Sequence, residues 1–286
     1  MRKELHSIAV LALAALLVSG CAGRQVESAP QEPSSTELGR ESFHQGHYAE
    51  AEQHFSTHLI DEPEHVQALL GLGKALLEQQ SLTRALEAFS EAMRLEPDNA
   101  NARQGKALAL LSLGNLREAE ELLEALSRQE SDRWRVWNAR GVIADLEGRP
   151  ADAAGHYERA REHGGHNEAV ENNLGYSLMM AGSLEEAEQV LRRATDHYPD
   201  SRRLRANLAM ALARQGRYEE AVREMRATHA RHEALNNVGY VALLREDHEA
   251  AVSLLEQALQ ASPRHYSRAE ANLERTRRAL AEGREQ

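Results

Sequence analysis

Small and bulky apolar residues recur along this chain in a fixed order and at a spacing of 34 residues. A glycine or alanine occupies the first position of this order in six successive segments, at Gly39, Gly73, Ala107, Gly141, Gly175 and Ala209. An alanine follows twelve residues later, and four residues after it stands a bulky residue, at Phe55, Phe89, Leu123, Tyr157, Leu191 and Met225. Apolar residues between these positions recur three or four apart, which predicts amphipathic helices. Each segment therefore predicts two helices whose small residues allow a close approach.

The segment 172–199 shows both helices of one such pair. Leu174 and Leu178 lie on one stripe of the first predicted helix, and Ala187 lies on the inward stripe of the second. Pro199 ends the second helix, because proline has no N–H group with which to continue it.

This period and this order of residues are the pattern of the tetratricopeptide (TPR) repeat, a pair of antiparallel helices. We therefore predict an all-α fold, a right-handed TPR solenoid of about seven helix pairs over residues 34–265. The predicted units are 32–65, 66–99, 100–133, 134–167, 168–201, 202–231 and 232–265. The sixth unit is short, so its second helix is expected to end near Thr228. A capping helix, Tyr266 to Ala281, is expected within the segment 266–286, because an open array end exposes apolar surface.

The start of the chain has a different pattern. Arg2 and Lys3 precede an apolar run from Ile8 to Val18, which is too short to cross a bilayer as a mature helix. Such a run after basic residues is typical of the central part of a secretory signal peptide. We therefore expect residues 1–20 to be a signal peptide.

The apolar run leads into Val18-Ser19-Gly20-Cys21. This stretch resembles the lipobox of bacterial lipoproteins, in which the cysteine becomes lipid-modified after cleavage. The resemblance implies lipid attachment at Cys21, and Ala22, which is not an aspartate, implies the periplasmic face of the outer membrane. Residues 21–33 would then be the lipidated cysteine and a disordered tether. The alternative is a free or buried cysteine after an ordinary signal peptide.

Charge and motifs exclude several classes of function. The formal net charge is −11, which disfavours nucleic-acid binding because that binding relies on lysine and arginine against phosphate. The same charge favours a neutral or basic protein partner. The chain has one cysteine, so an internal disulfide is impossible. Nucleophile-elbow, zinc-protease and phosphate-loop motifs are missing from the sequence, so we expect no enzyme, no catalytic residue and no cofactor.

Histidines are frequent in the first unit, at His44, His47, His54, His58 and His65. His54 and His58 are four residues apart on a predicted helix, close enough to share a metal ion. No carboxylate or third histidine completes the set at a convincing spacing. We therefore expect no metal site and interpret the histidines as a solvated polar face.

Asparagines recur at two neighbouring positions of the first helices, although asparagine is a mediocre helix former. They are Asn138, Asn172 and Asn236 at the fifth position and Asn173, Asn207 and Asn237 at the sixth. Amides both donate and accept hydrogen bonds, so these residues, with Tyr176 and Tyr240 on or near the same face, are candidates for a groove that binds an extended partner segment. The alternative is that the amides join one repeat to the next, and the two interpretations are compatible.

Four stretches carry a resemblance to a known family: VWNARGVIADLEGRPADAAGHYERA at 136–160, NNLGYSLMMAGSLEEA at 172–187, RANLAMALARQGRYEEA at 205–221 and NNVGYVALLREDHEAAVSLLEQAL at 236–259. Together with the lipobox they resemble the TadD-type TPR lipoproteins of tight-adherence (Flp) pilus assembly. The resemblance implies an outer-membrane scaffold that helps a pilus secretin or its partners assemble. The alternatives are a type IV pilus pilotin of the PilF/PilW type and a general periplasmic adaptor lipoprotein.

Overall fold

The computed structural model describes residues 33–129 and 132–282. In these residues the chain forms fifteen α-helices and no strand, which confirms the all-helical prediction. The helices are α1 (Ser35–His44), α2 (Tyr48–Asp61), α3 (Val66–Glu78), α4 (Leu82–Leu95), α5 (Ala100–Ser112), α6 (Leu116–Gln129), α7 (Trp134–Leu146), α8 (Pro150–Glu162), α9 (Glu168–Met180), α10 (Leu184–His197), α11 (Arg202–Arg214), α12 (Tyr218–Arg226), α13 (Arg231–Leu244), α14 (His248–Ala261) and α15 (Ser267–Glu282). The predicted signal peptide, Cys21 and the tether up to residue 32 lie outside the described residues.

Local sequence sets several of the helix ends. Ser34 caps α1: its Oγ accepts the N–H of Glu37 at 3.3 Å, and the Glu37 carboxylate accepts the N–H of Ser34 at 2.8 Å. These two bonds form a capping box, which pairs amide groups that the helix itself leaves unbonded. Pro150 begins α8, where its missing N–H costs nothing. Helix α12 has nine residues and ends at Arg226, near the Thr228 predicted for the short sixth unit.

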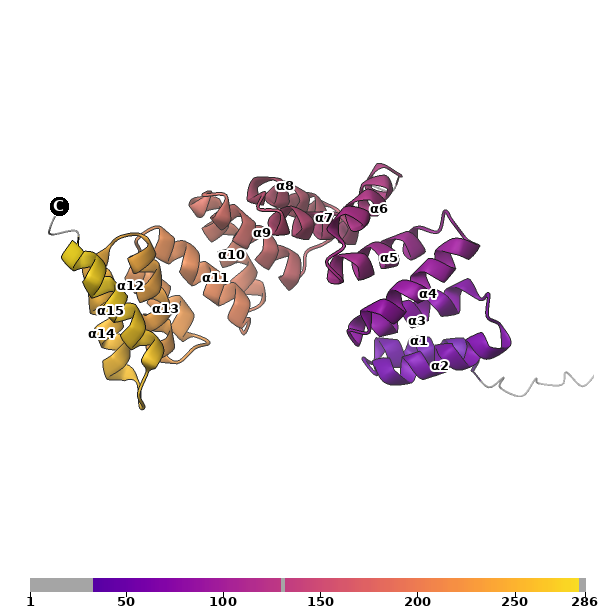
Figure 1. Ribbon diagram of the computed structural model, residues 1–286, viewed down its shortest axis with the longest axis horizontal. Coiled ribbons are helices and arrows are strands. Elements are labelled where there is room, and N and C mark those ends of the chain that lie inside the picture. The colour runs from indigo at the N-terminus through magenta and orange to yellow at the C-terminus, as the bar shows by residue number, and fades with distance from the viewer. Residues whose placement is uncertain (1–32, 130–131, 283–286) are drawn as a thin grey trace, which may run out of the picture.

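The helices form a curved array with an inner and an outer layer. Odd-numbered and even-numbered helices pair within each unit, and every odd-numbered helix also packs against the next odd-numbered one. Among the described residues no even-numbered helix packs against another even-numbered helix. The odd-numbered helices therefore lie on the shorter, inner arc. Figure 1 shows this array as an arch that runs from α1 at one end to α15 at the other.

Helix α15 extends the array beyond seven helix pairs. It packs against both α14 and α13, as the first helix of a following unit does elsewhere in the chain. Ala269, Leu273 and Thr276 of α15 are buried in this contact. The helix expected as a cap is thus the first helix of an incomplete eighth unit, and it covers the apolar surface of the seventh.

The predicted small and bulky positions form the core. The alanines of the second helices have no exposed surface; they are Ala51, Ala85, Ala119, Ala153, Ala187, Ala221 and Ala251. The bulky residues four positions later are buried as well, at Phe55, Phe89, Leu123, Tyr157, Leu191, Met225 and Leu255. Since each unit buries the same two positions, one packing scheme runs through the whole array.

Trp137 is buried in the core, where it packs against Ala160 of α8 and Val170 of α9. The imidazole of His156 stacks on the indole with 5.8 Å between ring centroids. The guanidinium groups of Arg159 and Arg140 lie 4.7 and 5.4 Å from its centre. Burial, together with these two cations, lowers the pKa of His156 to about 4.

Candidate functional site

The asparagines of the first helices bond to one another across the joints between units. Asn207 Nδ2 donates to Asn172 Oδ1 at 2.8 Å, and Asn173 Nδ2 lies 3.4 Å from Asn138 Oδ1. In both pairs the sixth position of one unit reaches back to the fifth position of the unit before it. The structure therefore contains the inter-repeat bonds that the sequence analysis left as the alternative role of these residues.

The same bond recurs at the end of the array. Asn272 Nδ2 of α15 donates to Asn236 Oδ1 at 3.1 Å. Asn237 has no such partner, because Ala206 stands at the fifth position of the sixth unit. Its Nδ2 lies 3.6 Å from the sulfur of Met225 instead. The amide pair is therefore missing at the joint between the sixth and seventh units and present again between the seventh unit and α15.

Burial separates the candidate groove residues into two kinds. Asn172 and Asn236 are only 5% and 1% exposed, so they lie inside the joints and not on the groove surface. Asn138, Asn173, Asn207, Asn237 and Tyr240 are partly buried, whereas Tyr176 is 42% exposed. Of the residues predicted to bind a partner, Tyr176 is therefore the one that a partner reaches most easily.

Large apolar side chains are exposed along the first helices of the C-terminal half. Met180 is 46% exposed, Leu146 63% and Leu244 61%. We call these three residues and Tyr176 the apolar stripe. They come from α7, α9 and α13, all of which belong to the inner layer. An array of packed helices gains nothing by exposing such residues, so the stripe is suited to contact with another chain.

A pocket of about 460 Å³ lies on the inner layer of the N-terminal half. Residues of four successive first helices line it, with additions from α4 and the α6–α7 loop: Phe43, Lys74, Leu77, Glu78, Phe89, Asn101, Gln104, Gly105, Leu108, Asp132, Arg133, Trp134 and Arg135. We call it the α1–α7 pocket. The sequence analysis did not single it out, because its residues stand at different positions of their units.

The α1–α7 pocket contains two cations that make no ion pair with any other described residue, Lys74 and Arg135. The guanidinium carbon of Arg135 lies 4.5 Å from the ring centre of Trp134, in a cation–π contact. Burial, and then the positive charge of Arg135, lower the pKa of Lys74. A ligand carboxylate placed between these two groups would relieve that repulsion, although Glu78 and Asp132 also line the pocket and bring negative charge of their own.

Glycine lets two phenylalanine rings pack closely against the first helices of this half. A Cβ atom on Gly105 would lie 2.2 Å from the ring of Phe89, so no side chain fits there. Gly71 of the preceding first helix faces the ring of Phe55 in the same way, with a distance of 2.4 Å. The two glycines therefore make room for rings that are buried in the core.

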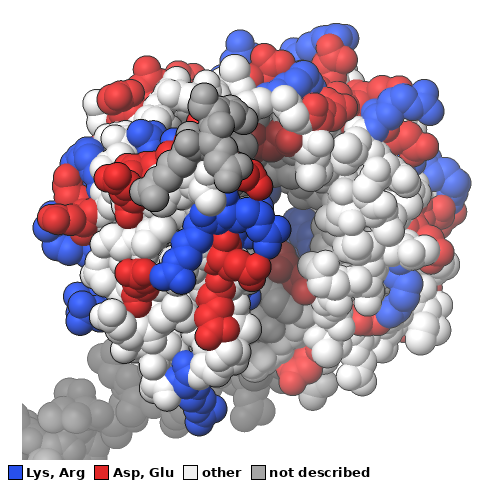
Figure 2. Space-filling model, turned by 60° about the vertical axis from the view of Figure 1, so that its left-hand side comes forward, with Lys and Arg blue, Asp and Glu red and all other residues white. Residues whose placement is uncertain are grey.

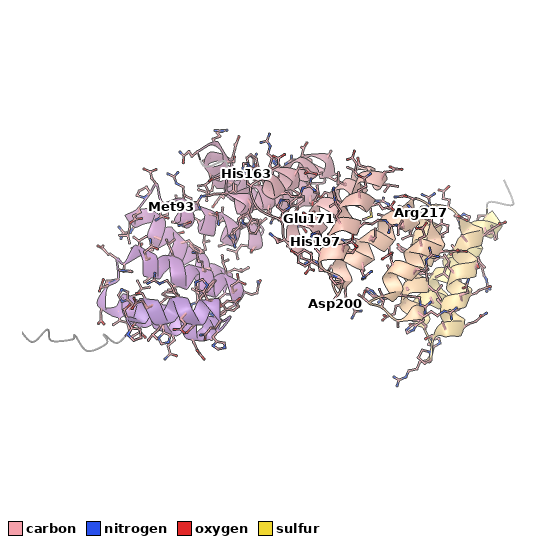
Figure 3. The ribbon with its side chains drawn as sticks, turned by 180° about the vertical axis from the view of Figure 1, so that it is seen from behind. Met93, His163, Glu171, His197, Asp200 and Arg217 are labelled. Carbon is pink, nitrogen blue, oxygen red and sulfur yellow. The ribbon has the colours of Figure 1, made fainter. Side chains whose placement is uncertain are left out.

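A second hollow lies between α8, α9 and α10, and apart from Arg193 its charged side chains are paired. Glu171 lies 3.9 Å from Arg161 and 3.5 Å from His166. The Nδ1 atom of His197 is 2.7 Å from the carbonyl oxygen of Arg193, to which it donates. Glu171 and His197 are labelled in Figure 3, where they lie near each other. This hollow therefore offers a ligand less uncompensated charge than the α1–α7 pocket does.

The whole inner surface surrounds an open hollow. Figure 2 shows this hollow from one side, with a largely uncharged wall on its right and lysine and arginine side chains at its edge. Among the described residues, no helix combines the length and the hydropathy needed to span a bilayer. The inner layer carries the α1–α7 pocket in one half and the apolar stripe in the other.

Known protein families match this chain over most of its length. The family described as cilia and flagella-associated protein 70 C-terminal domain matches residues 7–237. The chain belongs to this family of TPR proteins. A tetratricopeptide repeat family also matches this TPR protein at residues 232–265. No curated protein matches the chain.

Solved structures share the fold of this TPR protein at low sequence identity. A tetratricopeptide repeat protein from Parabacteroides merdae is 16% identical, with a TM-score of 0.56 over 85% of this chain and 97% of its own. A thermophilic TPR protein from Thermus thermophilus is 22% identical, with a TM-score of 0.54 over 62% and 97%. PilF from Pseudomonas aeruginosa is 16% identical, with a TM-score of 0.55 over 72% and 95%. TPR proteins are typically non-enzymatic scaffolds that bind other proteins, and this chain shares their repeat and their fold.

Proposed function

We propose that this TPR protein is an outer-membrane lipoprotein that binds a pilus-assembly component in its inner groove and helps a pilus secretin assemble or reach its place. Three observations support the proposal: the lipobox-like stretch ending at Cys21, the resemblance of 136–259 to TadD-type proteins, and the likeness of fold to PilF. The Flp pilus is the preferred system. A pilotin of the PilF/PilW type is the second candidate, since PilF shares the fold over most of its own length.

The observation that carries the binding role is that the inner layer combines the α1–α7 pocket with the apolar stripe. Some charges of the outer layer are paired, as in Arg217 with Glu220 at 2.7 Å, whereas Arg193 and Arg223 of that layer have no ion pair among the described residues. On the inner layer Lys74 and Arg135 have no ion pair among the described residues, and the apolar stripe is exposed. A chain that binds nothing gains no stability from either feature.

The two inner features suggest what the partner segment looks like. One part carries a carboxylate beside an apolar or aromatic side chain, for the α1–α7 pocket with its Trp134. Another part carries apolar side chains for the stripe on α7, α9 and α13. Both features lie on the same layer of helices, so one extended segment reaches them in turn.

Charge reversal in the pocket tests this groove. The double variant Lys74→Glu/Arg135→Glu of the full-length, detergent-solubilised protein is expected to bind the secretin about tenfold less tightly, a change of about 1.4 kcal/mol. The control is Arg117→Glu on α6, a second helix. That side chain is 87% exposed, and its ion pair with Glu121 is long, at 4.0 Å. Unchanged secretin binding by the double variant, with an unchanged thermal melt, would remove the pocket from the proposal.

A second pair of variants separates the stripe from the asparagines. Tyr176→Ser/Met180→Ser is expected to weaken secretin binding without lowering the melting temperature, since both side chains are already largely exposed. The triple variant Asn173→Ala/Asn207→Ala/Asn237→Ala is expected to lower the melting temperature, because Asn173 and Asn207 join neighbouring units. If the triple variant lost binding and kept its melt, the asparagines would belong to the groove.

Membrane attachment has its own test. Cys21→Ser removes the sulfur to which the lipid would be attached, so the protein is expected to leave the outer-membrane fraction. A Cys21→Ser protein that still fractionates as a mature outer-membrane protein would disprove the lipid anchor. Co-purification with an Flp secretin or with a type IV pilus secretin then decides between the two candidate systems.

A further inference from the structure

Three side chains with metal-ligand atoms meet where α2 ends and α3 begins. His58 lies in the last turn of α2, Glu62 follows that helix as its C-cap, and His65 is the N-cap of α3. One ligand atom from each lies within 4.8 Å of the other two. We propose that His58, Glu62 and His65 bind one Zn²⁺ ion, or a transition-metal ion of similar preference, at the joint between the first two units. This inference is independent of the proposed function.

The third ligand, His65, joins the other two because the chain reverses direction between α2 and α3. His58 and Glu62 are one turn apart, while His65 arrives from the far side of the α2–α3 loop. The sequence analysis considered His54 and His58 on one helix and found no third ligand. His54 does not belong to the cluster that the structure assembles.

The geometry is close to that of a bound ion. His58 Nε2 and Glu62 Oε2 are 3.8 Å apart, and the two imidazole centroids are separated by 4.5 Å at 82°. Neighbouring ligand atoms of a tetrahedral zinc site are about 3.3 Å apart, given bonds of about 2.0 Å. Small side-chain movements therefore bring the three atoms to coordinating distance.

His58 supplies a separate observation that points to a ligand. Its side chain is only 17% exposed, and its Nε2 atom is buried without a hydrogen-bond partner. Buried polar atoms are almost always bonded, because an unpaired one loses its interaction with water. A bound metal ion would give the Nε2 atom of His58 the partner that it lacks.

The donor set selects the kind of ion. Two imidazoles and one carboxylate suit zinc and its transition-metal neighbours, whereas Mg²⁺ and Ca²⁺ prefer oxygen ligands alone. Three protein ligands leave the fourth tetrahedral position to water. The nearby Glu64 is not one of the proposed ligands, because its carboxylate pairs with Arg94 at 3.8 Å.

Metal binding competes with a helix cap. His65 Nδ1 accepts the N–H of Ala68 at 3.1 Å, so the ring carries its proton on Nε2. An ion on Nδ1 takes the same lone pair, and an ion on Nε2 moves the proton to Nδ1. Either way the amide of Ala68 loses its acceptor, which is a local signature of binding that a non-specific surface site does not produce.

The experiment uses the full-length, detergent-solubilised protein and Zn²⁺, with Mg²⁺ as the control ion. Calorimetry is expected to show one Zn²⁺ per chain and no Mg²⁺ binding. His65→Asn removes the imidazole and keeps a good N-cap residue. It and His58→Ala are expected to weaken Zn²⁺ binding about tenfold or more, because even the loss of partners outside the ligand shell costs roughly 10–100-fold. His54→Ala, the matched control on α2, is expected to bind as the parent does.

The amide signal of Ala68 gives a second readout. In a ¹H–¹⁵N spectrum it is expected to shift when Zn²⁺ is added to the parent protein and to stay in place in His65→Asn. Absence of Zn²⁺ binding in the parent would overturn the proposal. So would parent-like affinity in His65→Asn, or an equal loss in His54→Ala, which would assign the ion to the histidine-rich surface in general.

Discussion

The joints between units are built in two ways in the two halves of this protein. In the N-terminal half a phenylalanine ring packs against glycines of two successive first helices: Phe55 against Gly39 and Gly71, and Phe89 against Gly73 and Gly105. In the C-terminal half the sixth position of the first helix holds an asparagine, which bonds to an asparagine of the preceding unit at two joints. There the bulky residue of the second helix is Tyr157, Leu191, Met225 or Leu255, and glycine faces it at Gly141, Gly175 and Gly239.

The difference shows that one helix-pair geometry accommodates two solutions to the same contact. A ring fills the joint when the facing residue is glycine, and an amide pair fills it where an asparagine also stands at the fifth position of the preceding unit. The choice also shapes the inner surface. The half with the glycine joints carries the α1–α7 pocket, whereas the half with the asparagine joints exposes Tyr176 and Met180.

Exchanging the two solutions is expected to have the largest effect. Gly105→Asn puts the asparagine typical of the C-terminal half into a joint of the N-terminal half. Its Cβ atom would lie 2.2 Å from the Phe89 ring. We expect the free energy of unfolding to fall by about 3 kcal/mol, the upper part of the range for overpacking. Denaturant melts measure it. The matched control is Gly155→Asn on α8, where a Cβ meets nothing within 4 Å.

A compensating change sharpens this test. Adding Phe89→Leu to Gly105→Asn replaces the ring by the side chain that Leu191 provides in the C-terminal half. The double variant is expected to be more stable than the sum of the two single changes predicts, because the two residues share one space. Simple additivity would show that the two positions do not define the joint.

The contact within a helix pair is expected to be the same in both halves. Ala85 and Ala187 have no exposed surface, so Ala85→Leu and Ala187→Leu should each cost about 1–3 kcal/mol. Thermal melting of the two variants measures the costs side by side. A large cost in one half and none in the other would mean that the halves differ inside the units as well as between them.

The amide joint is expected to contribute less than the glycine joint. Asn172→Ala leaves Asn207 Nδ2 without its acceptor in a buried contact, at a cost of about 1–2 kcal/mol. A cycle of Asn172→Ala, Asn207→Ala and the double variant isolates the bond. If the melts gave a coupling free energy near zero, the bond between Asn172 and Asn207 would not contribute to stability.

Acid is expected to weaken the middle of the array through His156. Its folded pKa of about 4 is below its ordinary value of 6.5, so between these pH values the unfolded chain binds a proton that the folded chain does not. The stability due to the neutral ring is complete above pH 6.5 and is lost as the pH falls toward 4. His156→Gln is expected to flatten the pH dependence of the melting temperature in that window, and an unchanged slope would contradict the lowered pKa.

The smallest expected effect is a gain. The turns inside five units have glycine in the left-handed region, for example Gly182 with φ 91°, but the second unit has Gln80 there with φ 59°. Gln80→Gly is expected to raise the stability by about 0.5–1 kcal/mol, because glycine adopts this conformation without a Cβ clash. Glu246, with φ 62° in the seventh unit, allows the same test in the other half.

Local sequence alone determined the helices and the order of packing. The 34-residue period places Ala187 and Leu191 on the inward stripe, and Ser34 with Glu37 sets the first helix end, because these effects act over one or two helical turns. The short α12 also followed from the length of its unit. The candidate groove was predicted only in part: Tyr176 is exposed on the inner layer, but Asn172 and Asn236 lie inside the joints.

Tertiary structure decided the rest, because it depends on which residues of different units meet. The period marks a position as the fifth or sixth of its helix, but only the packing of neighbouring helices shows whether its amide faces the groove or the next unit. The α1–α7 pocket combines Lys74 and Trp134 from different positions of different units, so no single period contains it. His58 and His65 likewise meet only because the chain reverses between them.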